Sequence, residues 1–344
     1  MFFHPQANHR TQKKIFLLPL LLLLCITCTG CSETQMQEKT SRSGFYFDTV
    51  ITLTIYGSVK DSEAILEDAF LLCESYDRTF SRTLDGSDVK NINDAAGQPV
   101  TVSQDTICLL ETALYYAELS DGKIDPTIAP VKDLWDFSSN TLPDSNALAA
   151  ACSHVDYHHV ILDKETNTVT LTDPDAKLDL GFIAKGYIAD RLKEYLLSQG
   201  VTHAIIDLGG NVLCIGGKPD GSAYRVGIRY PFGDASDIIT DLSCSDKSIV
   251  TSGIYERYFT LDDTIYHHIL DTETGYPVRN NLLSVTILSS TSVQGDALST
   301  LCYIYGPEDG MALVESLDDV EAIFITDDYK LHYSSGLVSE NTAQ

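Results

Sequence analysis

Hydrophobic and polar positions alternate in many short segments of this chain and follow a helical period in only a few. Residues 47–57 (FDTVITLTIYG) alternate and end in glycine, which predicts a strand. Residues 62–80 and 103–119 carry apolar side chains at helical spacing, which predicts two amphipathic helices, the second capped by Ser103. The segment 120–137 contains two prolines and is expected to be an ordered loop.

The second half of the chain is rich in predicted strands. These segments are 158–163, 167–172, 177–181, 203–210, 211–217, 224–230, 248–262, 265–271, 282–289 and 322–335. Helical periods interrupt them at 184–199, ended by Gly200, and at about 293–305. Strands joined by short turns, with helices interspersed, predict an α+β fold rather than a regular alternation of strands and helices.

The first 30 residues have the pattern of a signal peptide. Basic residues between His9 and Lys14 precede an apolar run, 15–29, that contains a proline and is short for a membrane span. The run leads into Thr-Gly-Cys, which resembles the bacterial lipoprotein box and makes Cys31 the expected lipidated residue. An ordinary cleaved secretory signal is the alternative. Lipidation would anchor an exported protein to the outer face of the bacterial cytoplasmic membrane.

Two polar segments flank the expected globular part. Residues 31–44 carry the lipidated cysteine and are expected to form a flexible tether, and residues 337–344 are expected to be a disordered tail. The chain has 23 basic and 49 acidic residues, a net charge of −26, which argues against nucleic acid as a partner. Six of the nine cysteines follow residue 31, far apart and without zinc-site spacing, and are expected to be buried thiols, with a disulfide left open.

A turn from a predicted strand into a predicted helix places Lys185 close to the first helical turn. Backbone N–H groups and a lysine at such a turn suit a phosphate or pyrophosphate. A solvated surface lysine is the alternative. The spacing of Gly181 and Gly186 matches half of a nucleotide-binding loop, but Tyr187 and Ile188 stand where that loop requires Lys and Ser or Thr.

Two further groups of residues are candidates for chemistry. Asp296 and Thr300 lie four apart on a predicted helix, and this pair of oxygen donors suits Mg²⁺, although an exposed aspartate at a helix start is the alternative. His267 and His268 are neighbours in a predicted strand, so one is expected to point inward and the other toward solvent. An inward histidine could act as a general base, or have no role beyond packing.

Six segments, taken together and in order, resemble the motifs of the ApbE-like FAD:protein FMN transferases. They are SDGKIDPTIAPVKDLWDF, LDLGFIAKGYIADR, DLGGN, TSGIYERYF, HHILDTETGYPV and GDALST. The resemblance runs from Phe45 to about Ile325. It implies one two-lobed domain over 45–336, with mixed, largely antiparallel sheets. It also implies Mg²⁺-dependent transfer of the FMN moiety of FAD to a Ser or Thr hydroxyl of an exported flavoprotein, with release of AMP.

The resemblance also implies roles for particular residues. Asp296 and Thr300 are the expected side-chain ligands of Mg²⁺, the backbone carbonyl of Phe182 is a further ligand, and His268 is the base that deprotonates the acceptor. The expected contacts to FAD are Phe47, Lys123, Ile124, Asp125, Asp179, Lys185 and Leu270. The chain departs from the family at Phe47, where methionine is usual, and near Thr83, where many relatives carry a tyrosine.

Two other functions remain open at this point. Water could replace the acceptor hydroxyl, which would make the protein a Mg²⁺-dependent FAD pyrophosphatase. The chain could also be a lipid-anchored flavin-binding protein without catalysis, in which case replacement of Asp296 would not change FAD turnover.

Overall fold

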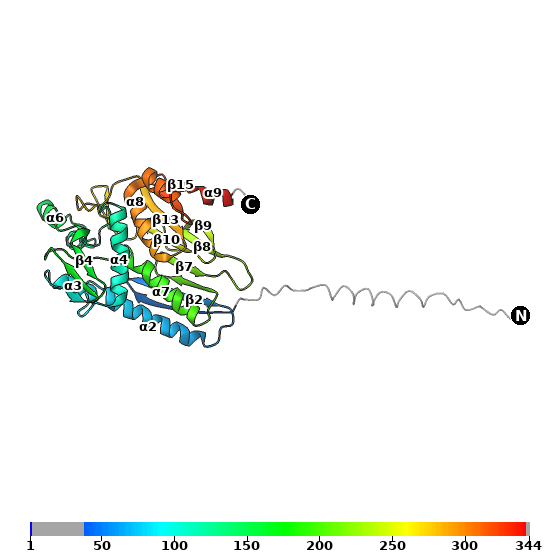
Figure 1. Ribbon diagram of the computed structural model, residues 1–344. Helices are drawn as coiled ribbons and strands as arrows, with labels where there is room; N and C mark the ends of the chain where they lie inside the picture. The colour runs from blue at the N-terminus through cyan, green and yellow to red at the C-terminus, as the bar shows by residue number, and fades with distance from the viewer. Residues whose placement is uncertain (2–37, 342–344) are drawn as a thin grey trace. The chain divides into compact units, whose positions relative to one another are not determined.

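The computed structural model describes residue 1 and residues 38–341, and the folded part begins with an eight-stranded sheet (Figure 1). Its strands follow the order β1-β2-β6-β7-β10-β13-β14-β15, and all neighbouring pairs are antiparallel. In chain order these are β1 (Lys39–Tyr46), β2 (Thr49–Tyr56), β6 (Ala204–Asp207), β7 (Asn211–Ile215), β10 (Ser248–Gly253), β13 (Leu282–Ser289), β14 (Glu321–Thr326) and β15 (Leu331–Tyr333). The expected α+β fold with largely antiparallel sheets is confirmed.

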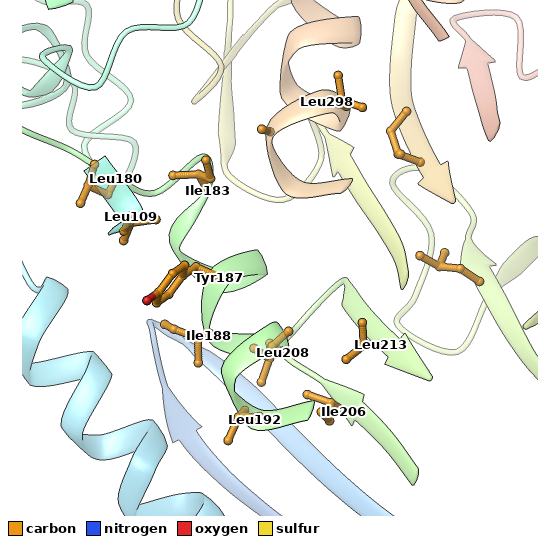
Figure 2. Packing of buried hydrophobic residues seen from close by; sticks show 14 of the residues in the cluster. Leu109, Leu180, Ile183, Tyr187, Ile188, Leu192, Ile206, Leu208, Leu213 and Leu298 are labelled. Atoms are coloured by element: carbon orange, nitrogen blue, oxygen red, sulfur yellow. The ribbon is translucent and has the colours of Figure 1, made fainter. Parts of the chain in front are cut away.

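Three long helices pack against one another and against this sheet. They are α2 (Ser62–Phe80), α7 (Ala184–Ser198) and α8 (Ser292–Glu315), and α4 (Gln104–Leu119) completes the main core. Figure 2 shows the apolar face of α7, with Tyr187, Ile188 and Leu192, close to Ile206 and Leu208 of the sheet region. The apolar spacing read from the sequence therefore predicts which face of α7 is buried.

Short elements form a second, smaller sheet and its surroundings. This sheet has the order β3-β5-β4, with strands β3 (Val100–Thr101), β4 (Val160–Asp163) and β5 (Thr168–Leu171). The short helices are α3 (Asp88–Asp94), α5 (Ala129–Lys132), α6 (Ser145–Cys152) and the 3-10 turn η2 (Tyr157–His159). A second apolar core surrounds Trp135, whose indole N–H donates to the Gly275 carbonyl at 2.8 Å. The three-stranded sheet and α3 contribute side chains such as Val89, Val160 and Val169 to the main core, whereas this second core joins α5 and α6 to Phe259 and Leu270.

The remaining elements are two hairpins and a final helix. They are β8 (Tyr224–Arg229) with β9 (Ile238–Cys244), β11 (Tyr258–Leu261) with β12 (Thr264–His267), and α9 (Ser335–Asn341). Within residues 38–341 no helix is long and apolar enough to cross a membrane. The six cysteines of this range form no disulfide, and four of them are buried.

Several predicted boundaries differ from the structure. The tether expected over 31–44 gives way to strand β1 at Lys39. This edge strand lacks an apolar pattern because hydroxyls pair it with β2, as in the contact between Ser43 and Thr52. The tail expected over 337–344 contains most of α9, whose Leu337 is buried. The signal peptide, Cys31 and the rest of the tether lie outside the described residues.

The strand expected over 177–181 does not form. The side chain of Asn93 accepts from the N–H of Leu178 at 2.6 Å and donates to its carbonyl at 3.0 Å, taking the place of a neighbouring strand. The strand expected over 248–262 is split into β10 and β11, and the loop expected over 120–137 contains the four-residue helix α5.

The helix predicted over 293–305 extends further than expected. A non-helical Gly306, with φ of 83°, and Pro307 mark a kink after Tyr305, and a second helical segment follows it within α8. Glycine followed by proline is a typical helix end, which explains the predicted boundary.

Candidate active site

A single pocket of about 320 Å³ collects every residue to which the family resemblance assigned a role. It lies where the turn before α7, the start of α8, β10 and the segment after β12 meet. Its walls include Phe47, Lys123, Ile124, Asp125, Asp179, Phe182, Lys185, His268, Leu270, Asp296 and Thr300. Residues from Phe47 to Thr300, distant in the chain, therefore form one site.

The starts of α7 and α8 are locked together by two carboxylates. Asp296 of α8 accepts from the N–H of Gly186 at 2.8 Å, and Asp190 of α7 accepts from the N–H groups of Ser292 and Val293 at 2.8 and 2.9 Å. Each carboxylate thus satisfies backbone donors at the start of the other helix. A Cβ at position 186 would collide with the Ser292 carbonyl, so this approach requires glycine.

Asp296 and Thr300 offer the oxygen donors that a hard divalent cation needs. Burial raises the pKa of Asp296 to about 6, with the charge of Lys185 acting in the opposite direction. The Thr300 hydroxyl lies 3.1 Å from the Ser252 hydroxyl, and Phe182 lines the same pocket. The raised pKa shows that nearby positive charge does not offset the burial of this carboxylate. A buried carboxylate beside a hydroxyl fits Mg²⁺, which would keep phosphate oxygens and water as its other ligands.

Asp179 anchors two cations that the sequence reading did not single out. Its Oδ1 accepts from Lys132 Nζ at 2.7 Å, and its Oδ2 lies 3.2 Å from Arg82 Nε. Although burial favours the protonated form, the charge of Lys132 and the surrounding hydrogen bonds hold the pKa of Asp179 below its usual value. The carboxylate therefore stays charged and orders Lys132 at the pocket wall.

Lys185 and Arg257 line the pocket without forming an ion pair to any residue in 38–341. The guanidinium of Arg257 lies 5.5 Å from the ring centre of Phe137, which holds it in place. With net charge −26, the chain is strongly acidic, and two cations without an ion-pair partner in one pocket create a local site for an anion. Arg257 and Lys132 both lie in motifs quoted from the sequence. Their positive charge within an acidic chain could have identified them as candidates for binding an anion.

The two adjacent histidines face different sides, as the predicted alternation requires. His267 is only 4% exposed; its Nε2–H donates to the Val278 carbonyl at 3.0 Å, and its Nδ1 accepts from the N–H of Ile269 at 3.3 Å. The inward histidine is thus a packing residue. His268 is half-buried and faces the pocket instead.

His268 has the geometry of a base. Its Nδ1 lies 3.3 Å from the carbonyl of Arg257, so this nitrogen carries the proton and Nε2 keeps a lone pair. Burial, followed by the charge of Lys132, lowers the pKa of His268 to about 3, so the ring is neutral at pH 7. The phosphates of a bound anion act against Lys132 and would raise this pKa.

The aromatic rim of the pocket sits on a strained turn. Phe47 and Asp48 join β1 to β2 with φ of 54° and 58°, a conformation that costs non-glycine residues about 1 kcal/mol or more each. The N–H of Phe47 donates to Asp77 at 3.1 Å, which holds the turn against α2. The phenylalanine that departs from the family pattern is thereby fixed at the pocket.

Asp125 lines the pocket but is held by the protein itself. One of its oxygens accepts from the N–H and hydroxyl of Thr127, at 2.7 and 2.6 Å, and the other accepts from the N–H of Tyr157 at 2.7 Å. In this structure Asp125 therefore stabilises the loop before α5 and links it to Tyr157. Lys123 at the rim pairs with Glu273 at 2.7 Å, which joins this loop to the segment after β12.

Burial of a neutral His267 predicts a pH-dependent stability. Burial lowers its pKa to about 4, so between pH 6.5 and 4 the unfolded chain binds a proton that the folded chain does not. The free energy of unfolding is therefore unaffected by the titration of this histidine above pH 6.5. Between pH 6.5 and pH 4 it falls by about 1.4 kcal/mol for each pH unit of acidification. His267→Phe should cost about 1–3 kcal/mol at pH 7, because two backbone partners are lost.

Urea unfolding of wild type and His267→Phe at pH 7 and pH 5 measures this effect. The difference between the two proteins should shrink at pH 5, and a difference independent of pH would contradict the assignment. His332→Phe, at an exposed position on β15, is the control and should show no such change.

Comparison with known proteins matches nearly the whole described chain. A model of the ApbE family matches residues 47–324. A Klebsiella pneumoniae protein named FAD:protein FMN transferase is 38% identical over 298 residues, covering 86% of this chain and 92% of that one. A protein of the same name from Treponema pallidum is 34% identical over 337 residues, covering 92% and 93%. The structure of the ApbE protein from Thermotoga maritima superposes with a TM-score of 0.81 at 30% identity, over 88% of this chain and 99% of that one. That of the flavin transferase ApbE from Vibrio cholerae gives 0.78 at 27%, over 88% and 99%.

Proposed function

Since this chain belongs to the ApbE family and is an FAD:protein FMN transferase, we propose that it transfers FMN to a Ser or Thr hydroxyl of an exported acceptor protein, with Mg²⁺ bound in the pocket. The proposal rests on one observation: a pair of oxygen donors, two cations without an ion-pair partner and a neutral histidine lie in the same pocket. Together these features meet two requirements of pyrophosphate chemistry.

The first requirement is to bind FAD at its pyrophosphate. Lys185 and Arg257 supply positive charge in the pocket, and Lys132, ordered by Asp179, adds a third cation at its wall. Phe47 provides an aromatic face for one of the rings of FAD. Asp296, Thr300 and the carbonyl of Phe182 would hold Mg²⁺, which when bound withdraws charge from the phosphate oxygens.

The second requirement is to activate a weak nucleophile. The Nε2 of His268 takes the proton of the acceptor hydroxyl as its oxygen bonds to the phosphorus on the riboflavin side. The bond from that phosphorus to the bridging oxygen breaks, and AMP leaves with the bonding electrons. The Arg257 carbonyl keeps the imidazole in the tautomer that this step needs.

Replacing Lys185 or Arg257, the two cations without an ion-pair partner, should weaken FAD binding. Lys185→Met and Arg257→Met are each expected to raise the KM for FAD about tenfold, which is about 1.4 kcal/mol, and Arg257→Met should also reduce the dependence of KM on salt. Steady-state release of AMP at several FAD concentrations measures this. Arg225→Met removes an ion pair with Asp241 on the β8/β9 hairpin and should leave KM unchanged. Unchanged KM in both pocket variants would contradict the pyrophosphate site.

The alternative of a pyrophosphatase makes a different mixture of products. Incubation with FAD and Mg²⁺, without acceptor, should release AMP and FMN only slowly, and addition of an acceptor protein should accelerate AMP release without a matching rise in free FMN. Rapid and equal release of AMP and FMN without acceptor would favour hydrolysis.

Export and membrane attachment form the last part of the proposal. The basic and apolar segments before Cys31 support a cleaved signal with lipidation of that cysteine, which would place the pocket outside the cytoplasmic membrane. The acceptor would then be another exported protein. Mass spectrometry of the N-terminal peptide from native membranes tests this, and an unmodified peptide that still begins at Met1 would contradict it.

A further inference from the structure

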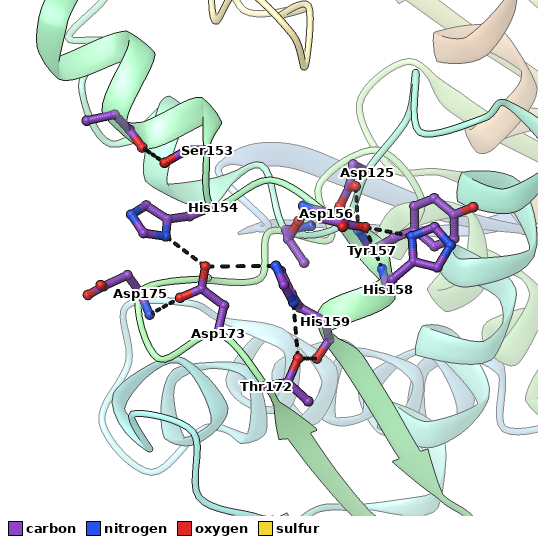
Figure 3. A network of polar contacts seen from close by, with 12 residues as sticks. Asp125, Ser153, His154, Asp156, Tyr157, His158, His159, Thr172, Asp173 and Asp175 are labelled. Carbon is purple, nitrogen blue, oxygen red and sulfur yellow. Dashed lines mark hydrogen bonds and ion pairs between the residues drawn. The ribbon is translucent and has the colours of Figure 1, made fainter.

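We propose a second metal site, suited to Zn²⁺, formed by His154, His159, Asp173 and Asp175 beside the three-stranded sheet. None of these four residues lines the active-site pocket. They come from the loop after α6, from η2 and from the turn after β5, so one ion would join three segments (Figure 3).

The possible ligand atoms converge on one carboxylate. His154 Nδ1 lies 2.7 Å from Asp173 Oδ2, and His159 Nε2 lies 3.9 Å from the same oxygen. One ligand atom each from His154, Asp173 and Asp175 can be chosen so that all three lie within 4.8 Å of one another. Tetrahedral Zn²⁺ places its ligand atoms about 3.3–3.5 Å apart, so His159, which lies outside this group of three, would have to move toward His154 to complete the site.

His159 presents Nε2 toward Asp173 while Thr172 contacts its other ring nitrogen. The Thr172 hydroxyl donates to the His159 carbonyl at 3.4 Å, and its oxygen lies 3.1 Å from His159 Nδ1. Thr172 thus engages Nδ1, whereas Nε2 faces the Asp173 carboxylate at 3.9 Å, beyond hydrogen-bond distance. A histidine that contacts a fixed oxygen through one nitrogen and presents the other toward a carboxylate has the usual arrangement of a metal ligand.

The donor set favours zinc over the cation of the active site. Two imidazoles with carboxylates suit Zn²⁺, whereas Mg²⁺ selects oxygen ligands. Both histidine side chains are about one third exposed, at 32% and 31%, and that of Asp173 is 16% exposed, so an ion can enter from solvent.

The position of the site suggests what the ion does. Between the two histidines, the N–H of Asp156 donates to the Thr127 hydroxyl at 2.9 Å and the N–H of Tyr157 donates to Asp125 at 2.7 Å. Asp125 belongs to the wall of the active-site pocket. An ion bound by His154 and His159 would thus brace the segment that supports this wall.

His158 provides a matched control within the same turn. It follows Tyr157 directly, but its Nδ1 contacts Asp156 at 2.7 Å, its ring stacks on Tyr157, and it is exposed. Figure 3 shows it away from Asp173. His158→Ala removes one imidazole from η2 without removing a proposed ligand.

The test is titration of the untagged full chain with Zn²⁺ by calorimetry, in excess Mg²⁺. Wild type and His158→Ala should bind one equivalent more than the His154→Ala/His159→Ala double variant, and Zn²⁺ should raise the Tm of the first two proteins only. Any Zn²⁺ held in the active-site pocket would remain in the double variant, so the lost equivalent belongs to this site. Thermal unfolding without Zn²⁺ shows whether the double variant is folded.

Two results would overturn the proposal. One is that the folded double variant binds as much Zn²⁺ as wild type, and the other is that wild type takes up none in excess Mg²⁺. Either would mean that His154 and Asp173 form only an ion pair. Because binding and Tm are the readouts, both results are independent of flavin transfer.

Discussion

Replacing Asp296 by asparagine should reduce FMN transfer by on the order of 10²–10³-fold, equivalent to about 3–4 kcal/mol in the barrier. Asparagine keeps an oxygen that can accept from the N–H of Gly186, so the contact between α7 and α8 survives. It removes the negative charge that the proposed Mg²⁺ site needs. The rate of AMP release with an acceptor present, measured over a range of Mg²⁺ concentrations, should show both a lower rate and a weaker response to Mg²⁺.

The neighbouring hydroxyl gives a matched pair of controls. Thr300→Ser keeps the oxygen and should retain most activity, whereas Thr300→Val keeps the shape and should lose much of it. The Tm of Asp296→Asn should equal or exceed that of wild type, because a buried charge with raised pKa has been removed. Wild-type rates and Mg²⁺ dependence in Asp296→Asn would rule out this carboxylate as a ligand.

Replacing His268 by alanine should slow transfer by about 10²–10⁴-fold while FAD still binds. The ring supplies the lone pair that accepts the hydroxyl proton, and the proposed cationic contacts to FAD come from other residues. Single-turnover transfer to an acceptor measures the loss, and fluorescence quenching of FAD measures binding. His158→Ala, an exposed histidine outside the pocket, should transfer at the wild-type rate.

Added imidazole separates a missing base from a damaged site. A small diffusible imidazole should restore part of the rate in His268→Ala and do nothing for Asp296→Asn, because only the first variant lacks a proton acceptor. A His268→Ala protein that transfers as fast as wild type would contradict the assignment.

Short-range patterns predicted much of the fold and of the site. The apolar period of 62–80 predicts α2 to the residue, and Ser103 caps α4 as expected, accepting from the N–H of Thr106 at 3.2 Å. The spacing of Asp296 and Thr300 predicts that they share a helix face, and both line the pocket. These features depend on residues a few positions apart, which is why the sequence reveals them.

Features that depend on distant partners were not predictable. The side chain of Asn93 bonds the backbone of Leu178, 85 positions away, as a neighbouring strand would. Asp179 orders Lys132, which is 47 positions away. The β1 strand was read as a tether because its partners are hydroxyls on β2, which leave no apolar alternation. In each case the decisive contact is set by tertiary structure rather than by local pattern.

The mass of an acceptor protein after incubation with this enzyme, FAD and Mg²⁺ tests the central claim most directly. We predict a gain equal to one FMN, mapped to a Ser or Thr, that disappears with EDTA or with His268→Ala. An unmodified acceptor that accompanies stoichiometric release of free FMN and AMP, repeated with a second acceptor, would contradict transfer and identify hydrolysis as the reaction.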